Sequence, residues 1–331
     1  MVRLAPSMAP RGDDPKRVIV DTDTAGDDTQ AILMAVLSEG LTVEALTIVS
    51  GNVEFDYEVE NAKYTLQLAD RADVPVYEGA RSPLLKEHGY ADYVHGEGGL
   101  GGVLFPDTGI PSADGHAVDY IVETAHERPG EVSLLCIGPL TNVAQALFRE
   151  PDLNDLLDEV WVMGGAANCL GNVTPAAEYN FWVDPDAAKC VLRHLDVTLV
   201  DWGVCVRDSL LDADDIAAFE DAGTRYAEFF STITGPVREF TKTQNGVDGT
   251  TQPDSLTVAV AIHPEIVEEA GTYFVDVDER EGLTRGYSAV DEGGVLDGRP
   301  RTRVVESVDA DRFRSMFTAM MREGDPEKPL D

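Results

Sequence analysis

Four aspartates lie close together near the start of the chain, directly after a short apolar run. The run 18–20 leads into Asp21 and Asp23, and Asp27 and Asp28 follow shortly after. Such a run is typical of a buried strand, and the residues after Gly26 predict a helix with one apolar face. Four like charges this close cannot all stay ionised cheaply without a cation. Since Ca²⁺ and Mg²⁺ prefer carboxylate oxygens, the cluster predicts a metal or active site at the strand end.

A simpler interpretation of these aspartates is that they stabilise the start of a helix, where the dipole favours negative charge. That interpretation suffices for one aspartate but not for a whole cluster at a strand end, so we favour a site. Asp254 raises the same choice, because it precedes the apolar helix predicted at 255–261 and is either an N-cap or a metal ligand.

Strand-like and helix-like runs alternate along the first two thirds of the chain. This order predicts an open, mainly parallel α/β sheet with helices on both faces, in a single domain. Ligands bind such folds beyond the carboxyl ends of the strands. The expected strands are 17–21, 43–49, 132–137, 159–163 and 196–201, with helices at 27–38, 55–70, 115–127, 139–149 and 185–194. Helices at 211–221, 224–243 and 309–322 and strands at 271–277, 284–290 and 302–306 are expected later.

Polar residues follow several of these runs, where each could serve a site or merely close a turn or cap a helix. The long Gly-rich segment 81–107 predicts a structureless loop, which is either a functional lid or disordered, and it contains His95. The polar residues after strand ends include Asn52, Thr141, Asn142, Asn172, Glu178 and Asn180.

The chain of 331 residues has 61 acidic and 25 basic side chains and a formal net charge of −36. This charge argues against nucleic acid or a membrane as partner and indicates a halophile's protein, kept soluble where salt screens self-repulsion. The four cysteines show no metal-ligand spacing, and no secretory apolar segment is present, so we expect a reduced, cytoplasmic protein. Residues 1–15 predict a flexible tail and 16–331 the folded domain.

Taken together, these residues resemble the inosine–uridine nucleoside hydrolase family over nearly the whole chain, as an acidic, haloarchaeal-like member. The resemblance implies one Ca²⁺ at the bottom of a ribose pocket, and a purine or pyrimidine ribonucleoside as the small-molecule substrate. The matching motifs are Asp21–Asp28, Gly51–Asn52, His95–Leu100, Gly138–Asn142, Met163–Gly165, Gly171–Asn180 and Val183–Pro185.

The resemblance also implies residue roles and an activity. The implied calcium ligands are Asp23, Asp28, Asp254 and the main-chain carbonyl of Thr141. The implied substrate contacts are Asp27, Asn52, Glu178 and Asn180 at the ribose hydroxyls, with Met163 and Asn172 near the 5′ side. Asp23 would take the proton of the attacking water as general base, and the N-glycosidic bond would be hydrolysed to free base and ribose. We further expect a homodimer or homotetramer.

Three positions depart from the family pattern. Thr24 and Ala25 replace Pro and Gly in the first motif, although the spacing of the aspartates is kept. Pro253 stands where many members carry a His that protonates the leaving base. We therefore expect no single indispensable proton donor, with His95, Arg238 and Gln252 as candidates for protonation and Trp182 and Tyr226 as candidates for stacking.

Two alternatives remain open from the residues alone. An aspartate-nucleophile phosphatase would also place Asp21 and Asp23 after a strand, but it needs a Lys for phosphate, and Lys is scarce here. A non-catalytic, calcium-dependent nucleoside- or sugar-binding protein would explain the missing His, whereas the retained aspartates argue for an active enzyme.

Overall fold

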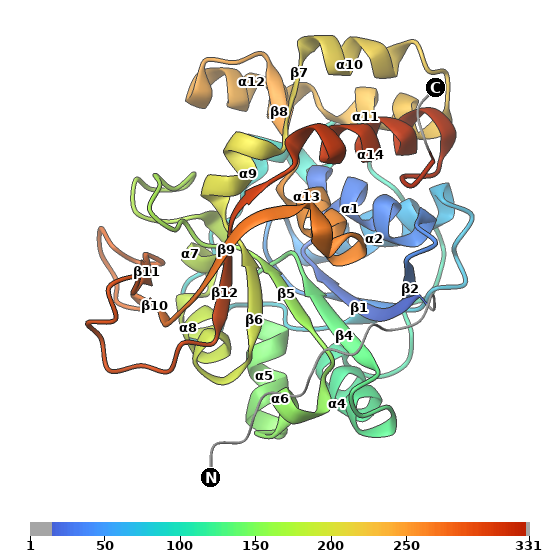
Figure 1. Ribbon diagram of the computed structural model, residues 1–331. Helices are drawn as coiled ribbons and strands as arrows, with labels where there is room; N and C mark the ends of the chain where they lie inside the picture. The colour runs from blue at the N-terminus through green and yellow to red at the C-terminus, as the bar shows by residue number, and fades with distance from the viewer. Residues whose placement is uncertain (1–14, 329–331) are drawn as a thin grey trace.

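An eight-stranded sheet forms the centre of the molecule (Figure 1), in a computed structural model that describes residues 15–328. Residues 1–14 of the predicted tail lie outside the described residues. Neighbouring strands are parallel except for the last pair, so the predicted open, mainly parallel sheet is confirmed. The order is β3 (Val76–Glu78), β2 (Leu41–Ile48), β1 (Lys16–Thr22), β4 (Val132–Cys136), β5 (Val160–Met163), β6 (Val197–Val200), β12 (Thr302–Val308) and β9 (Val267–Tyr273).

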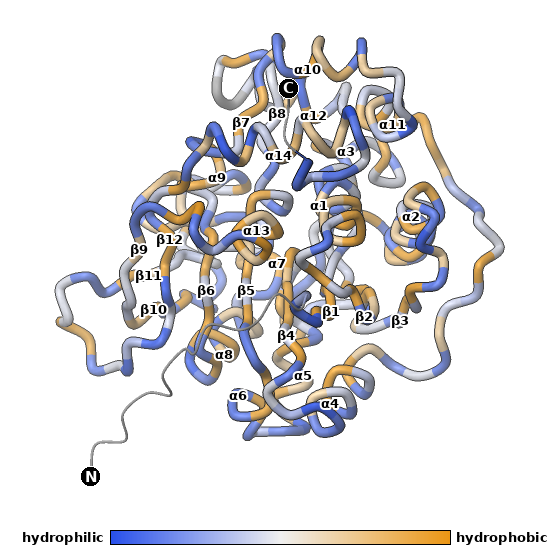
Figure 2. Tube along the Cα trace, turned by 45° about the vertical axis from the view of Figure 1, so that its right-hand side comes forward, coloured by the Kyte–Doolittle hydropathy of each residue, from blue (hydrophilic) through white to orange (hydrophobic). Residues whose placement is uncertain are grey.

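Helices cover both faces of the sheet, because the strands are apolar on both sides. In β1, Val18 and Val20 belong to one core and Ile19 to the other. Figure 2 shows the hydrophobic colour concentrated in the central strands and in α13. One core contains α1 (Gly26–Leu37), α2 (Phe55–Leu68), α13 (Pro253–Ile262) and α14 (Ala310–Glu323), and the other contains α4 (Ala117–Glu127), α5 (Thr141–Arg149) and α8 (Pro185–His194).

Helix α1 is buried on nearly all sides, so the expected single apolar face is wrong. Residues 28–36 are all buried, and α13 and α2 pack against the helix. Its polar side chains are buried with partners: the Thr29 hydroxyl donates to the Gly26 carbonyl at 2.6 Å. Asp28 Oδ2 accepts from the Ala25 N–H at 3.0 Å. The first turn of α1 is therefore fixed rigidly beside the end of β1.

The region after β6 is more broken than the sequence predicts. The expected helix 211–221 begins as a strand, and Asp212 caps the helix that follows by accepting from the Asp214 and Asp215 N–H groups. The expected helix 224–243 is two helices, because Pro236 lacks the N–H that a continuous helix would use. The elements are α9 (Trp202–Asp208), β7 (Leu210–Asp212), α10 (Ala213–Glu220), α11 (Arg225–Ile233), α12 (Gly235–Asn245) and β8 (Gly249–Thr251).

Two further expectations differ in detail. The expected strand 271–277 is divided between β9 and a separate hairpin, and the segment 81–107 contains two short helices instead of being structureless. Both short helices are too brief to show a periodic apolar pattern. The remaining elements are α3 (Asp92–His95), η1 (Glu97–Gly99), α6 (Leu153–Leu156), α7 (Tyr179–Val183), η2 (Pro264–Ile266), β10 (Val275–Val277) and β11 (Ser288–Val290).

The sheet order reverses between β1 and β4, where the chain has run outward through β2 and β3 before returning. Ligands of open α/β sheets bind at such a point, beyond the carboxyl ends of the strands. The Asp21–Asp28 motif lies at this end of β1, as predicted. Within residues 15–328, no helix is both long and apolar enough to cross a membrane.

Candidate active site

A cavity opens over the carboxyl ends of the central strands and encloses about 880 Å³ of empty space, part of it open to solvent. Asp23 and Asp28 adjoin it through the lining residue Asn52, whose side-chain amide donates to the Asp23 carbonyl at 3.1 Å and to Asp28 Oδ2 at 3.2 Å. The structure therefore brings together most of the residues singled out from the sequence. Those that line the cavity are Asp27, Asn52, His95, Met163, Asn172, Glu178, Asn180 and Asp254.

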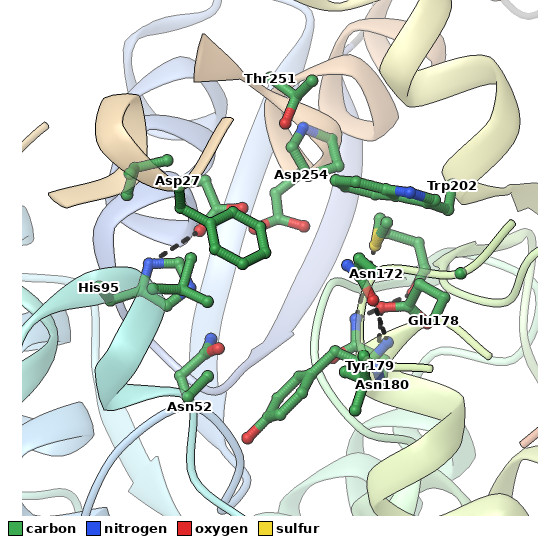
Figure 3. Close-up of a pocket in the computed structure, with 18 of the residues that line it drawn as sticks. Asp27, Asn52, His95, Asn172, Glu178, Tyr179, Asn180, Trp202, Thr251 and Asp254 are labelled. Atoms are coloured by element: carbon green, nitrogen blue, oxygen red, sulfur yellow. Dashed lines mark hydrogen bonds and ion pairs between the residues drawn. The ribbon is translucent and has the colours of Figure 1, made fainter. Parts of the chain in front are cut away.

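Carboxylates dominate one wall of this cavity. One oxygen each from Asp27, Asp28 and Asp254 lies within 4.8 Å of the others, and Figure 3 shows Asp27 and Asp254 facing one another. Asp28 reaches this position from the first turn of α1, and Asp254 from the first turn of α13. The contact between α1 and α13 thus brings together two aspartates that are far apart in the sequence.

The electrostatics of this wall favour a bound cation. Burial and the nearby Asp28 hold the pKa of Asp23 well above its usual range. Burial, followed by the charge of Asp27, raises the pKa of Asp28 to about 7. Burial also raises the pKa of Asp254, and the charges that act on it are all carboxylates. A divalent cation would offset this mutual repulsion.

The donor set fits Ca²⁺ or Mg²⁺. Asp23 Oδ1 is buried and has no hydrogen-bond partner in the described part of the chain, although its Oδ2 accepts from the Asn52 N–H at 3.0 Å. This unpartnered buried oxygen lies beside three further carboxylates. Together they offer the hard oxygen ligands that these cations prefer. Among the described residues that line the cavity there is no Lys or Arg, so the wall has no built-in cation.

The opposite wall is formed by residues at the start of α7. Glu178 caps this helix: its Oε1 accepts from the Asn180 N–H at 2.8 Å, and its Oε2 accepts from the Gly165 N–H at 2.7 Å. Burial raises the pKa of Glu178 to about 7 in spite of these bonds. None of the expected helices covers segment 178–180. It is instead the cap and first turn of a five-residue helix, which fixes the direction of both side chains.

Three asparagines are oriented by bonds to the protein. The Asn180 amide group donates to the carbonyls of Ile137 at 3.1 Å and Met163 at 3.3 Å. With their amide protons used in this way, Asn52 and Asn180 retain Oδ1 as an acceptor for a ligand hydroxyl. Asn172 is held the other way, because its Oδ1 accepts from the Tyr179 N–H at 2.9 Å, which leaves its amide protons as donors.

His95 lies at the edge of the carboxylate wall, at the end of α3. Its Nδ1 is 3.7 Å from Asp27 Oδ1 and, within the described chain, has no hydrogen-bond partner. Burial lowers the pKa of His95, so the ring is neutral near pH 7. A neutral imidazole is a weak proton donor, which is consistent with the expectation that this site has no indispensable acid.

Aromatic side chains form the outer part of the cavity. Tyr93 of α3 and Phe240 of α12 pack with ring centroids 6.1 Å apart, and Trp202 of α9 lines the far side. Pro253 lines the cavity as well, at the first position of α13. The sequence analysis did not single out these three aromatic residues. Trp202 could have been found, because it directly follows the expected strand 196–201 and ligands bind beyond the carboxyl ends of strands.

The other candidates for the leaving group do not line the cavity. Trp182 packs its ring under the Arg285 guanidinium, and Tyr226 is buried beside α14. Arg238 pairs with Asp248 at 2.9 Å. Gln252 is buried too, with its amide donating to the Thr250 hydroxyl. The proposed stacking on Trp182 and Tyr226 is therefore wrong, because tertiary packing places both rings elsewhere.

Thr141, the implied main-chain ligand of the metal, does not line the cavity. It is fully buried in the first turn of α5, and its hydroxyl donates to Asp184 Oδ2 at 2.7 Å. The residue of this segment that lines the cavity is Ile137, directly after β4. The helical turn that begins at Thr141 turns the chain away from the strand end, which the spacing alone did not indicate.

The model of the inosine–uridine preferring nucleoside hydrolases matches residues 18–315, which is most of the chain. The chain belongs to this family. The match confirms the predicted family and enzyme class, that of N-glycosyl hydrolases, and it replaces the phosphatase alternative. A pyrimidine-specific ribonucleoside hydrolase of Escherichia coli is 32% identical over 93% of this chain and 97% of its own length. An uncharacterized protein of Schizosaccharomyces pombe is 33% identical over 90% of this chain and 96% of its own length.

Solved nucleoside hydrolases have the same fold. A plant nucleoside hydrolase superposes with a TM-score of 0.87 at 30% identity, covering 93% of this chain and 99% of its own. A purine-preferring ribonucleoside hydrolase from Gardnerella vaginalis gives 0.86 at 30% identity, with 93% and 98% covered. The family therefore includes relatives named for purines and for pyrimidines.

Proposed function

We propose that the protein hydrolyses the N-glycosidic bond of purine or pyrimidine ribonucleosides to free base and ribose, with Ca²⁺ bound. The observation that carries this proposal is the cavity itself. A carboxylate wall faces two hydroxyl acceptors, Glu178 and Asn180, and an aromatic rim lies outside both. This arrangement suits a sugar between the polar walls and a base between the rings.

Asp23, Asp28 and Asp254 would hold the cation, with Asp27 beside them. The Ile137 carbonyl replaces that of Thr141 in this proposal, because Ile137 lines the cavity and Thr141 does not. A bound calcium ion supplies Lewis acidity that lowers the pKa of a water and anchors sugar hydroxyls.

The chain's own side chains then carry the remaining steps. Asp23 takes the proton of the attacking water at Oδ1, the oxygen that has no partner in the described part of the protein. Asn52 and Asn180 accept hydrogen bonds from ribose hydroxyls through Oδ1. As the glycosidic bond breaks, positive charge develops on the sugar, and the surrounding carboxylates stabilise it.

Departure of the base depends on the aromatic rim. Trp202, Tyr93 and Phe240 can stack on a base. His95 is neutral because burial lowers its pKa, and Pro253 has no acidic proton. Neither residue is therefore a ready proton donor for the departing base.

His95→Ala is expected to lose less than about 10³-fold in kcat, because one positioned acid typically contributes 10²–10⁴-fold and a neutral His95 donates poorly. Steady-state kinetics on inosine and uridine measure this. A kcat loss at His95 that equals the loss at Asp23, with KM unchanged, would identify His95 as the leaving-group acid and contradict the account.

Calcium is expected to stabilise the protein more at pH 8 than at pH 5.5. Burial raises the pKa of Asp28 from 3.8 to about 7. In the metal-free protein, the stability that protonated Asp28 contributes is therefore fully present below about pH 4 and is lost as the pH rises through 7. Metal binding needs the ionised form and therefore strengthens over the same range. The measurement is the shift in melting temperature with added CaCl₂ at both pH values.

Asp28→Asn is the matched control for this titration and should lose most of the calcium-induced shift at pH 8. An equal shift at both pH values in the wild-type protein would contradict the proposed ligand set. The halophilic surface, the cytoplasmic location and the homodimer or homotetramer stay predictions.

A further inference from the structure

The turn Gly51–Asn52 lies directly against the carboxylate of Asp23. A side chain at Gly51 would collide with this carboxylate, so the backbone approaches it as closely as an amino acid allows. The Asn52 N–H donates to Asp23 Oδ2, and the Asn52 side chain donates to the Asp23 carbonyl. Any movement of this turn would therefore move Asp23 and Asn52 together.

The rest of the protein holds this turn through a set of polar contacts. The Gly51 N–H donates to Glu58 Oε1 at 2.9 Å. The Gly51 carbonyl accepts from the Tyr179 hydroxyl at 2.6 Å and lies 2.7 Å from His88 Nε2. Burial lowers the pKa of His88, so the ring is neutral and the proton on Nε2 is the one that can donate to this carbonyl.

The Tyr179 hydroxyl connects three parts of the cavity. Tyr179 lies between Glu178 and Asn180 in the sequence, and its ring lines the cavity, with the hydroxyl directed toward the side of Asn52 in Figure 3. Besides Gly51, the hydroxyl also lies 2.9 Å from the Gly89 carbonyl. It thus links the α7 wall to the Gly51–Asn52 turn and to the segment that leads to α3.

The single proton of the Tyr179 hydroxyl cannot donate to the Gly51 and Gly89 carbonyls at the same time. The Ala91 N–H donates to the Asn52 carbonyl at 2.7 Å, which ties the segment 88–91 to the same turn by a second bond. Tyr179 is the side chain of α7 that the described hydrogen bonds place on the Gly51–Asn52 turn, so it ties the α7 wall directly to Asn52.

We propose that Tyr179 is a positioning residue that sets the discrimination between ribose and 2-deoxyribose. Its hydroxyl fixes Asn52 relative to Glu178 and Asn180, so that the 2′-hydroxyl meets its acceptors in a productive position. This inference rests on the proposed function, since it names what makes that same site selective. Displacement of a site by about 1 Å can cost about 10²-fold in rate.

Tyr179→Phe removes the hydroxyl and keeps the ring. We expect the ratio of kcat/KM for uridine to that for 2′-deoxyuridine to fall by about tenfold or more. A role in stability alone would lower the active fraction for both substrates equally and leave the ratio unchanged. Tyr226→Phe is the matched control: Tyr226 is also buried, its hydroxyl accepts from Arg225 at 2.9 Å away from the cavity, and the ratio should not change.

A double-mutant cycle tests whether Tyr179 acts through Asn52. In an Asn52→Ala background, Tyr179→Phe should reduce the ratio no further, because the group that it positions has gone. An additive effect in that background, or an unchanged ratio in the single variant, would overturn the inference.

A readout that needs no turnover separates this inference from the proposed function. Calcium-loaded wild-type protein should be stabilised against heat more by ribose than by 2-deoxyribose, and Tyr179→Phe should remove most of that difference. Failure of the wild type to split any nucleoside would refute the proposed function, whereas the sugar comparison would still decide the role of Tyr179. An equal effect of both sugars on the wild type, or an undiminished difference in the variant, would refute that role.

Discussion

Asp23→Asn is expected to lose about 10³-fold or more in kcat on inosine and uridine. The asparagine keeps the size of the side chain and an acceptor for the Asn52 N–H, but it cannot take a proton from water. A general base typically contributes 10²–10⁴-fold, and loss of a proposed calcium ligand adds to this. Metal content of the purified variant, measured beside kcat, separates the two contributions.

Asp21→Asn is the matched control. Asp21 is also fully buried at the end of β1, with one oxygen unpartnered in the described chain. Its other oxygen accepts from Thr47 and Asn142, which do not line the cavity, whereas Asp23 bonds the lining residue Asn52. The Asp21→Asn variant should keep kcat within about tenfold of the wild type. A fully active Asp23→Asn that retains its calcium would contradict the role of Asp23.

Inosine is expected to exceed 2′-deoxyinosine in kcat/KM by about 10⁴-fold. A site built to bond a hydroxyl rejects the analogue that lacks it by about 10⁴–10⁵-fold, because buried polar groups are then left unpaired. Here Asn52 and Asn180 have their amide protons committed to the protein, so each offers only an oxygen to the sugar.

Competition kinetics with both nucleosides in one reaction measure this ratio directly. Asn52→Ala should narrow the gap, because one acceptor is removed with the rest of the cavity intact. Equal turnover of inosine and 2′-deoxyinosine by the wild type would show that these residues do not bind the 2′-hydroxyl.

The central sheet and the carboxylate wall could be predicted because their signals are local. The apolar run 18–20 predicts a strand, and the strand end predicts where Asp23 and Asp28 lie. Parallel strands share an edge, so residues far apart in sequence, such as Asn52 and Glu178, could be expected at one cavity.

The features that sequence reasoning missed depend on tertiary packing or on very short elements. Helix α7 has five residues and begins at a Glu178 cap, so it shows no apolar period. The aromatic rim comes from α3, α9 and α12, and only their packing selects Trp202 over Trp182. The division between α11 and α12 at Pro236 also determines where Phe240 lies.

The central claim is tested most directly by incubating the protein in high salt with inosine, with uridine and with p-nitrophenyl phosphate, each with and without a chelator. The account predicts free base and ribose from the nucleosides, no nitrophenol, and loss of nucleoside cleavage on chelation that returns with added CaCl₂. Full nucleoside cleavage after exhaustive chelation would contradict the metal site, and intact nucleosides in calcium would contradict the proposed activity itself.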